Sequence, residues 1–128
     1  MILDSSVIVA IVLKEPGYEN LLGKIQSASA IGMGTPTLVE TGIVLTARLD
    51  SGGKRILDRI LQEFQVTPVP FGEAHWREAV TAYERFGKGR HPASLNFGDC
   101  LSYATSRLTG QPLLFTGDDF AKTDVDVS

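Results

Sequence analysis

The chain has 128 residues, of which 43% are hydrophobic and 21% charged, so we expect one globular domain over residues 1–128 rather than a disordered segment. A single cysteine, Cys100, excludes an internal disulfide and a cysteine-based zinc site, and it favours a cytoplasmic protein. The net charge of −3 argues against a nucleic-acid-binding protein, unless a bound cation neutralises the acids at the place where they gather.

The N-terminal residues predict a buried strand followed by a buried helix. Residues 1–4 read MILD, a short apolar run that ends in an acid. Residues 5–15 continue as an apolar segment that Ser5 or Ser6 can cap as a helix. The run stops at Lys14, which leaves it too short to cross a bilayer, and no other run approaches the required length of about 20 apolar residues.

Three amphipathic helices and one short strand are predicted in the next stretch. Apolar residues recur at helical spacing over residues 16–28, 36–49 and 54–64. The short run at residues 30–36 predicts a strand that leads into a turn. We expect the apolar stripe of 54–64 to pack inside the domain; dimerisation or the docking of a partner segment on this stripe is the alternative.

The remaining elements continue the alternation of strands and helices. Residues 66–70 read VTPVP and predict a strand whose prolines place it at an edge or a strand end. Helices are predicted over 72–87 and 98–108, with a loop rich in glycine and cations between them at 87–96, and a buried strand at 111–116. This order indicates an α/β domain with a largely parallel sheet covered on both faces.

Two acids follow predicted strands at opposite ends of the chain. Asp4 ends the first strand, and Asp118 comes just after the last one. The carboxyl ends of parallel strands share one edge of the sheet, where ligands bind in α/β proteins, so the two acids can be neighbours in space. An Asx turn at Asp4, and an ordinary turn at Asp118 or Asp119, would explain the same residues without a ligand.

Glu40 stands on the predicted helix at 36–49 among apolar neighbours. Its side chain shares a helix face with Ile43, Val44 and Ala47, where an unpaired carboxylate is costly. A partner such as a lysine or a capping amide would explain it. The alternative is that Glu40 points inward at a cation.

Asp99 begins the helix at 98–108, in the segment LNFGDC. Capping of the helix, or complementation of its dipole, accounts for an acid at this position as well as metal binding does. The other acids favour metal binding, because four converging carboxylates repel one another unless a cation lies between them. Oxygen ligands without cysteine select a hard ion such as Mg²⁺ or Mn²⁺, which would lower the pKa of a bound water and neutralise charge on a phosphate.

The chain resembles the PIN domain, and more closely the VapC toxins of bacterial type II toxin–antitoxin systems. The resemblance rests on the segments MILDSSVIVAIVLKE, GTPTLVETGIVL, LNFGDCLSYATSRLTGQPLLFTGDDF and TDV, which together span essentially the whole chain. It implies a three-layer α/β/α sandwich with a central, mostly parallel sheet. It also implies a Mg²⁺- or Mn²⁺-dependent endoribonuclease that forms a homodimer and binds a cognate VapB-type antitoxin.

The resemblance also implies the residues of the site. Four acids would hold the metal and act in catalysis: Asp4, Glu40, Asp99 and Asp118. In many relatives two residues separate the fourth acid from an aromatic residue, whereas here only Asp119 stands between Asp118 and Phe120, so Asp119 is the reserve for this role. Ser6 and Thr116 match positions that support the acids by hydrogen bonds.

Cations near the predicted site are needed to attract RNA. The segment KGRH supplies Lys88, Arg90 and His91 in the loop that leads to Asp99, and we expect these side chains to contact the phosphates of RNA. An ordinary solvated loop is the alternative.

Two other kinds of function are weighed against the ribonuclease. A phosphatase of the haloacid-dehalogenase type needs Asp-x-Asp after the first strand, and here the segment is DSSV. A receiver-type phosphotransfer domain needs an acid at the end of a middle strand and a late lysine, which VTPVP and LLFTGDD do not supply. A catalytically inactive, PIN-like binding module would leave the four acids unexplained.

Three residues with reactive or bulky side chains are given structural roles. For His75 we expect a structural role within its helix, and for Cys100 that of a small buried hydrophobic residue, because no basic partner is in view. Trp76 is expected in the core or at an interface.

Overall fold

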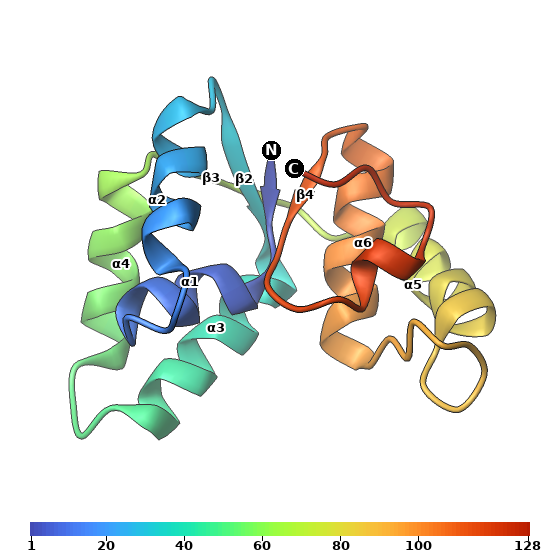
Figure 1. The fold of residues 1–128 in the computed structure, drawn as a ribbon, viewed down its shortest axis with the longest axis horizontal. Helices are drawn as coiled ribbons and strands as arrows, with labels where there is room; N and C mark the ends of the chain where they lie inside the picture. Colours follow the sequence, from blue (N-terminus) through green and yellow to red (C-terminus); the bar gives the residue numbers. More distant parts are fainter.

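The structure is a computed structural model that describes residues 1–128 as one α/β unit (Figure 1). In chain order the elements are β1 (Ile2–Leu3), α1 (Ser5–Val12), α2 (Tyr18–Ser27), β2 (Ile31–Gly34), α3 (Thr35–Arg48), α4 (Gly53–Glu63), β3 (Val66–Val69), α5 (Glu73–Phe86), α6 (Phe97–Thr109), β4 (Leu113–Leu114) and the short 3₁₀ helix η1 (Phe120–Lys122). Every strand and helix expected from the sequence is present within a few residues of its expected bounds. None of the helices combines the length and the apolar character that crossing a membrane requires.

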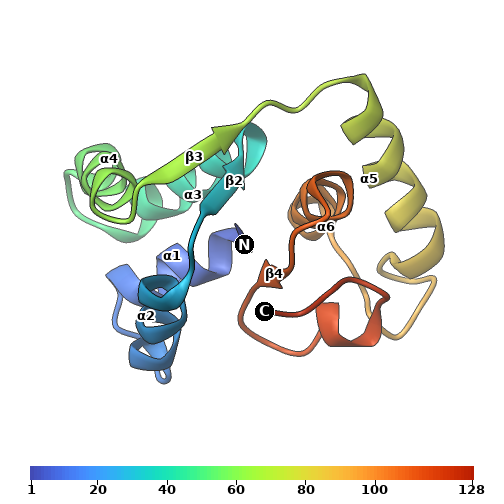
Figure 2. The same ribbon diagram turned by 90° about the horizontal axis from the view of Figure 1, so that it is seen from above.

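The four strands form one sheet in the order β3-β2-β1-β4, and all neighbouring strands are parallel. Figure 2 shows α1 to α4 on one side of this sheet and α5, α6 and the C-terminal segment on the other. The predicted three-layer α/β/α fold is therefore confirmed. Strand β3 lies at an edge, as the prolines in VTPVP predicted, because a proline has no N–H to donate to a second neighbouring strand.

Each face of the sheet has its own hydrophobic core, because successive residues of a strand point to opposite faces. Ile2 and Leu113 pack with α5 and α6, whereas Leu3 and Leu114 pack with α1 to α4. Even the two-residue strands β1 and β4 thus contribute to both cores. This double burial fixes the register of the central strands, and with it the position of the residues that follow them.

Helix α6 lies close over β2, because glycine removes the side chain at the contact. A Cβ atom at Gly34 would lie 2.7 Å from Oγ1 of Thr105 on α6. The close approach brings the first turn of α6 toward the carboxyl edge of the sheet, where α1 and α3 also begin (Figure 1).

The prediction that Ser5 or Ser6 caps the first helix is wrong. The N-cap of α1 is Asp4, whose Oδ2 accepts a hydrogen bond of 3.1 Å from the backbone N–H of Ser6. An aspartate that ends a strand already has the extended backbone of an N-cap, so the helix can begin one residue earlier than a serine cap would allow.

The prediction of which face of α3 is buried is also wrong. Its buried residues are Thr37, Thr41 and Leu45, whereas Ile43 is 64% exposed. The Thr41 hydroxyl donates to the carbonyl of Thr37, one turn back, which compensates its burial, whereas the buried hydroxyl of Thr37 has no hydrogen-bond partner. The apolar stripe of α4, in contrast, packs inside the domain as expected, with Leu57 buried in the core.

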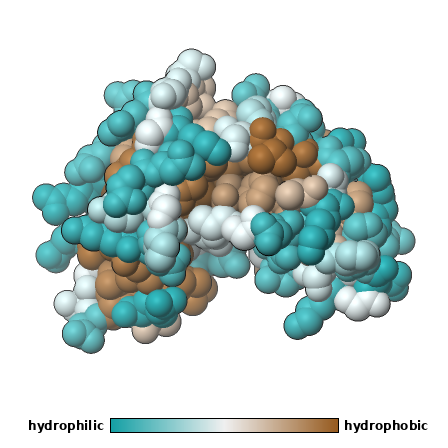
Figure 3. Space-filling model, in the orientation of Figure 1, coloured by the Kyte–Doolittle hydropathy of each residue, from teal (hydrophilic) through white to brown (hydrophobic).

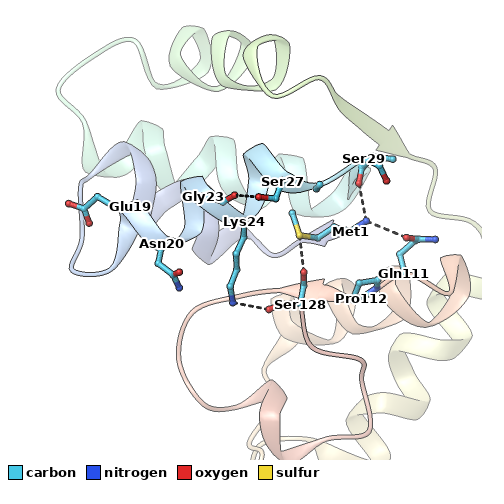
Figure 4. Close-up of a pocket in the computed structure, with 12 residues that line it drawn as sticks. Met1, Glu19, Asn20, Gly23, Lys24, Ser27, Ser29, Gln111, Pro112 and Ser128 are labelled. Atoms are coloured by element: carbon cyan, nitrogen blue, oxygen red, sulfur yellow. Dashed lines mark hydrogen bonds between the residues drawn. The ribbon is translucent and has the colours of Figure 1, made fainter.

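The amino edge of the sheet, opposite Asp4, holds both ends of the chain (Figure 4). A pocket of about 740 Å³ lies there. The Met1 ammonium donates to the carbonyl of Ala30 at 3.0 Å, and Lys24 Nζ donates to the carbonyl of Ser128 at 3.1 Å. The polar groups of this pocket therefore tie the two ends of the chain to α2 and its following loop.

Candidate active site

Asp4 stands at the centre of the carboxyl edge and is 5% exposed. Strand β1 ends at Leu3, and the side chain of Asp4 turns to cap α1. Its Oδ2 accepts the Ser6 N–H, and its Oδ1 accepts a hydrogen bond from the hydroxyl of Ser102 on α6. Hydrogen bonds from two different elements thus fix the orientation of this carboxylate.

Asp99 lies in the first turn of α6, where it takes part in a capping box. The Asp99 N–H donates to Oδ1 of Asn96 at 2.9 Å, and the Asn96 N–H donates to Oδ2 of Asp99 at 3.0 Å. Burial raises the pKa of the Asp99 carboxyl to about 6, with smaller contributions from the negative charges of Asp4, Asp119 and Glu40 and an opposing one from the Asn96 amide. Asp99 therefore caps α6 and also lies among the acids of the candidate site.

Glu40 reaches the same place from the second turn of α3. Its carboxylate lies so close to the α6 backbone that a Cβ atom at Gly98 would overlap with it. Burial raises the pKa of Glu40, the nearby Ser5 side chain lowers it, and the charge of Asp4 raises it further. Its Oε1 atom is buried and has no hydrogen-bond partner. A buried carboxylate oxygen without a donor is costly unless something else compensates its charge.

The two candidates for the fourth acid lie differently. Asp118 and Asp119 are both exposed, in the segment between β4 and η1. Asp119 contributes to the raised pKa of Asp99, whereas Asp118 is not among the charges that do so. The charge of Asp119 therefore acts on Asp99, and the choice between Asp118 and Asp119 as the fourth acid stays a prediction.

The supporting residues differ in part from those the sequence suggested. Ser6 supports Asp4 through its backbone N–H, and its hydroxyl accepts the Thr116 N–H at 3.1 Å, which ties the segment after β4 to α1. Ser102, which holds Asp4, was missed. Its position three residues after Asp99 on the same helix face was a signal, because side chains at i and i+3 are neighbours on a helix.

The acids fit a hard divalent cation by the chemistry of their donors. All offer carboxylate oxygens, the charges of Asp4, Glu40 and Asp119 reach Asp99, and Oε1 of Glu40 lacks a donor. The described ion pairs join only Arg77 to Glu73 and two arginines to Asp124, so no cation of the chain neutralises the site. No three acidic, histidine or cysteine side chains are close enough together to bind one ion directly. Mg²⁺ suits such a spacing, because it keeps several of its waters.

The loop with the expected RNA-binding cations joins α5 to α6 on the side of the molecule where α6 begins (Figure 1). Lys88 and Arg90 are exposed. His91 instead packs edge-on against Phe86, with ring centroids 5.1 Å apart, and its Nδ1 accepts the N–H of Ala93 at 3.0 Å. Two of the three residues therefore point charge to solvent, and the third stabilises the loop.

The remaining three residues behave largely as expected. His75 accepts the N–H of Gly72 on Nδ1 and packs on Phe71, which is a structural role. Cys100 is buried, and burial raises the pKa of its thiol to about 11, so it is not a nucleophile. Trp76 is 49% exposed, so it does not lie in the core, and its role at an interface stays a prediction.

A model of the PIN domain family matches residues 1–126, and the chain belongs to this family. Within it, the chain is 43% identical to a protein named Ribonuclease VapC from Mycolicibacterium smegmatis, over 98% of this chain and 97% of that protein.

Solved structures of VapC proteins share the fold. VapC20 from Mycobacterium tuberculosis, described as a toxin that cleaves the sarcin-ricin loop, has a TM-score of 0.75 at 20% identity, with 98% of this chain and 97% of that chain covered. VapBC2 from Rickettsia felis, solved with a DNA fragment from its promoter, has a TM-score of 0.73 at 17% identity, with coverage of 99% and 96%. At these identities the likeness shows the fold alone.

Proposed function

We propose that this protein is a metal-dependent endoribonuclease and the toxin of a type II toxin–antitoxin pair. The observation that carries the proposal is the group of acids at the carboxyl edge, in which Glu40 keeps a buried oxygen without a partner and no lysine or arginine offsets the charge. A VapC ribonuclease 43% identical over nearly the full chain supports RNA as the substrate. An RNA substrate and one unpaired cysteine also suit a cytoplasmic protein.

Asp4, Glu40, Asp99 and Asp119 would hold Mg²⁺, or Mn²⁺ in its place, in part through water molecules of the ion, since no three of these side chains are close enough to bind it directly. We prefer Asp119 to Asp118 as the fourth acid because its charge reaches Asp99. When bound, the ion would lower the pKa of a water molecule and neutralise charge on the phosphate.

The chain itself orients these acids. Ser102 and the Ser6 amide hold the two oxygens of Asp4, and the capping box with Asn96 holds Asp99. Carboxylates that are already held in place need little reorganisation as charge develops on the phosphate. This preorganisation is a main source of rate acceleration in such sites. Glu40, whose Oε1 has no donor, is free to accept a hydrogen bond from a water placed between it and Asp99.

Lys88 and Arg90 would contact the RNA backbone. Both are exposed on the loop that precedes α6, and they lie outside the ion pairs of the chain. Contacts to phosphate contribute affinity without sequence preference and weaken with salt.

The partners would be a VapB-type antitoxin and a second copy of this chain. The likeness to the VapBC2 assembly suggests the first. For the second, the chain has an apolar surface on α3, α5 and the start of α6, named here the α3–α5–α6 surface. Its exposed side chains are Val39, Ile43, Trp76, Val80, Tyr83 and Phe97. Figure 3 shows apolar side chains at the lower left, where α1 and α3 lie, and others near the top centre of a largely hydrophilic face.

The α3–α5–α6 surface fits another protein surface better than RNA. Two pockets of about 590 and 630 Å³ lie on it, and both are lined by Pro36, Phe97 and Leu101. With about 200 Å² for each aromatic side chain, and with Trp76, Tyr83 and Phe97 exposed by 49%, 42% and 79%, these three side chains alone expose on the order of 340 Å². That is a substantial part of the roughly 800 Å² that each partner contributes to a stable interface. We therefore assign it to a second copy of the chain.

The test of the proposed function uses the purified protein without antitoxin. We expect cleavage of RNA with Mg²⁺ or Mn²⁺, none with EDTA, and none for Asp99→Asn. Cleavage that persists in EDTA, or full activity of Asp99→Asn, would contradict the mechanism. Release of phosphate from small esters, with RNA left intact, would indicate a phosphatase. Binding of RNA or antitoxin without any cleavage would indicate an inactive binding module.

A further inference from the structure

The C-terminal segment carries a cluster of side chains that the proposed reaction does not use. Oδ1 of Asp124 accepts a hydrogen bond from the hydroxyl of Tyr103. Its Oδ2 accepts one of 3.1 Å from Nη2 of Arg85 and lies 3.6 Å from Nη1 of Arg107. The partners come from α5 and α6, whereas Asp124 follows η1. One carboxylate therefore joins the C-terminal segment to two helices.

The cluster is more than a pair of surface charges. The Tyr103 side chain is completely buried, and Asp124 is the one hydrogen-bond partner of its hydroxyl. The pKa of Tyr103 is raised to about 12 by burial and by Asp124, and the pKa of Asp124 is lowered by hydrogen bonds from Tyr103 and Arg85, against the effect of burial. A hydrogen bond to a charged acceptor is stronger than one between neutral groups, and this one is partly shielded from water.

The segment fixed in this way is the one that carries Asp119. Before Asp119, the segment is tied to α1 by the Thr116 N–H and the Ser6 hydroxyl. After it, Phe120 is buried and packs on Phe115, with ring centroids 5.0 Å apart. The Asp119 side chain is exposed and makes no hydrogen bond of its own, so its place depends on these anchors.

We propose that Asp124 is a positioning residue, which by binding Tyr103, Arg85 and Arg107 holds the Thr116–Asp124 segment, and with it Asp119, at the carboxyl edge of the sheet, where the Thr116 N–H reaches the Ser6 hydroxyl next to Asp4. The inference rests on the proposed function, because it takes Asp119 as one of the acids that hold the metal. Asp124 itself does not touch the metal or the RNA; it acts through the segment.

The experiment measures the affinity of the purified full chain, free of antitoxin, for Mn²⁺ by calorimetry. We expect Asp124→Ala to weaken binding by about tenfold, in the range seen when residues behind metal ligands are removed. Asp124→Asn keeps an acceptor for Tyr103 and should restore part of the loss. Asp126→Ala is the matched control, because its side chain is exposed in the same segment and makes no hydrogen bond, and it should bind Mn²⁺ as the parent chain does.

A double variant separates positioning from general loosening of the fold. If Asp124 acts through Asp119, Asp124→Ala should cause no further loss of Mn²⁺ affinity in a chain that already carries Asp119→Asn. An equal loss in both backgrounds would overturn the inference, as would an unchanged affinity of Asp124→Ala in the parent chain. Should Asp124→Ala fail to fold, Tyr103→Phe removes one of the same hydrogen bonds while keeping the ring, and the same comparison applies.

The failure of the proposed function would look different. A parent chain that binds no Mn²⁺, or one in which Asp99→Asn leaves Mn²⁺ binding unchanged, would contradict the metal site itself, and with it the inference. If Asp99→Asn and Asp119→Asn each weaken Mn²⁺ binding but Asp124→Ala does not, the inference about Asp124 is wrong while the proposed metal site stands.

Discussion

At the scale of single residues, the acids of the site serve the fold and the chemistry at once. Asp4 caps α1 while it accepts a hydrogen bond from Ser102, and Asp99 completes a capping box at the start of α6. Glu40 has no such structural role, and its unpaired Oε1 raises the cost of burying it. The uncompensated charge therefore lowers the stability of the metal-free protein, and this effect can be measured.

The first prediction concerns this charge. The pKa of Asp99 is raised from 3.8 to about 6, so the folded chain binds a proton more tightly than the unfolded chain. The stabilising effect of this proton is complete below about pH 4 and is lost as the pH rises through 6. Without metal, Asp99→Asn should remove this pH dependence. Because the carboxyl is partly exposed, we expect a gain in the free energy of unfolding on the order of 1 kcal/mol at pH 7, or a few degrees in Tm.

Thermal unfolding in EDTA at pH 4 and pH 7 measures this effect. The parent chain should lose stability relative to Asp99→Asn between the two values, and Asp126→Asn serves as a control at an exposed acid. Equal pH dependence of the parent chain and of Asp99→Asn would mean that the carboxyl of Asp99 is not buried as the structure has it.

At the scale of elements, the site depends on how closely α3 and α6 cross. The backbone of Gly98 touches the carboxylate of Glu40, so the first turn of α6 has room for a hydrogen atom there and for nothing larger. Alanine at a helix position normally stabilises a protein by up to about 1 kcal/mol relative to glycine. At Gly98 this gain opposes the displacement of Glu40.

The second prediction is that Gly98→Ala loses RNA cleavage without a matching loss of stability. The new methyl group would push the Glu40 side chain away from Asp99, while the helix itself gains from alanine. We expect cleavage to fall at least tenfold and the urea midpoint to change by less than the equivalent of about 1 kcal/mol. Gly42→Ala on α3 is the matched control, because its Cβ would make an ordinary contact of 3.5 Å with Leu57. A Gly98→Ala chain with full activity would show that Glu40 does not need its present place.

The helices and strands also show how much of the fold and of the site could be predicted from the sequence. The order of strands and helices follows from apolar runs and breakers, and the acids at the ends of β1 and β4 follow from that order. The buried face of α3 did not follow, because the polar Thr37 and Thr41 are buried while the apolar Ile43 is exposed, and of the two hydroxyls only that of Thr41 has a hydrogen bond within the helix. The hydrogen bond from Ser102 to Asp4 joins residues 98 positions apart, and only the packing of α6 against β1 brings them together.

At the scale of the whole molecule, one side of the chain remains apolar and open. The α3–α5–α6 surface adjoins the site, since Phe97 is 79% exposed two residues before Asp99, and one of its pockets is lined by both Phe97 and Glu40. An exposed apolar patch of this extent often marks a functional surface. A partner that covers it would also form one wall of the site.

The third prediction follows for the oligomeric state. Phe97→Glu and Ile43→Glu place charges on the α3–α5–α6 surface and should convert a dimer to a monomer in sedimentation at micromolar concentrations, because burying an unpaired carboxylate is costly. Val127→Glu is the control, since Val127 is 57% exposed outside this surface. If the parent chain is a monomer and gains mass only with antitoxin, or if both variants stay dimeric, the assignment to a second copy is wrong.

The unpaired oxygen of Glu40 also decides which inactive form of the protein is best suited to trapping RNA or antitoxin. Asp4→Ala removes the cap of α1 and leaves the hydroxyl of Ser102 without its acceptor, and Asp99→Ala opens the capping box of α6. The loss of cleavage in either variant would therefore come with a weakened fold. Glu40→Gln has the same shape, breaks no hydrogen bond to Oε1 and removes a charge that the fold does not use. A loss of cleavage in Glu40→Gln would therefore report a loss of catalysis rather than a loss of stability.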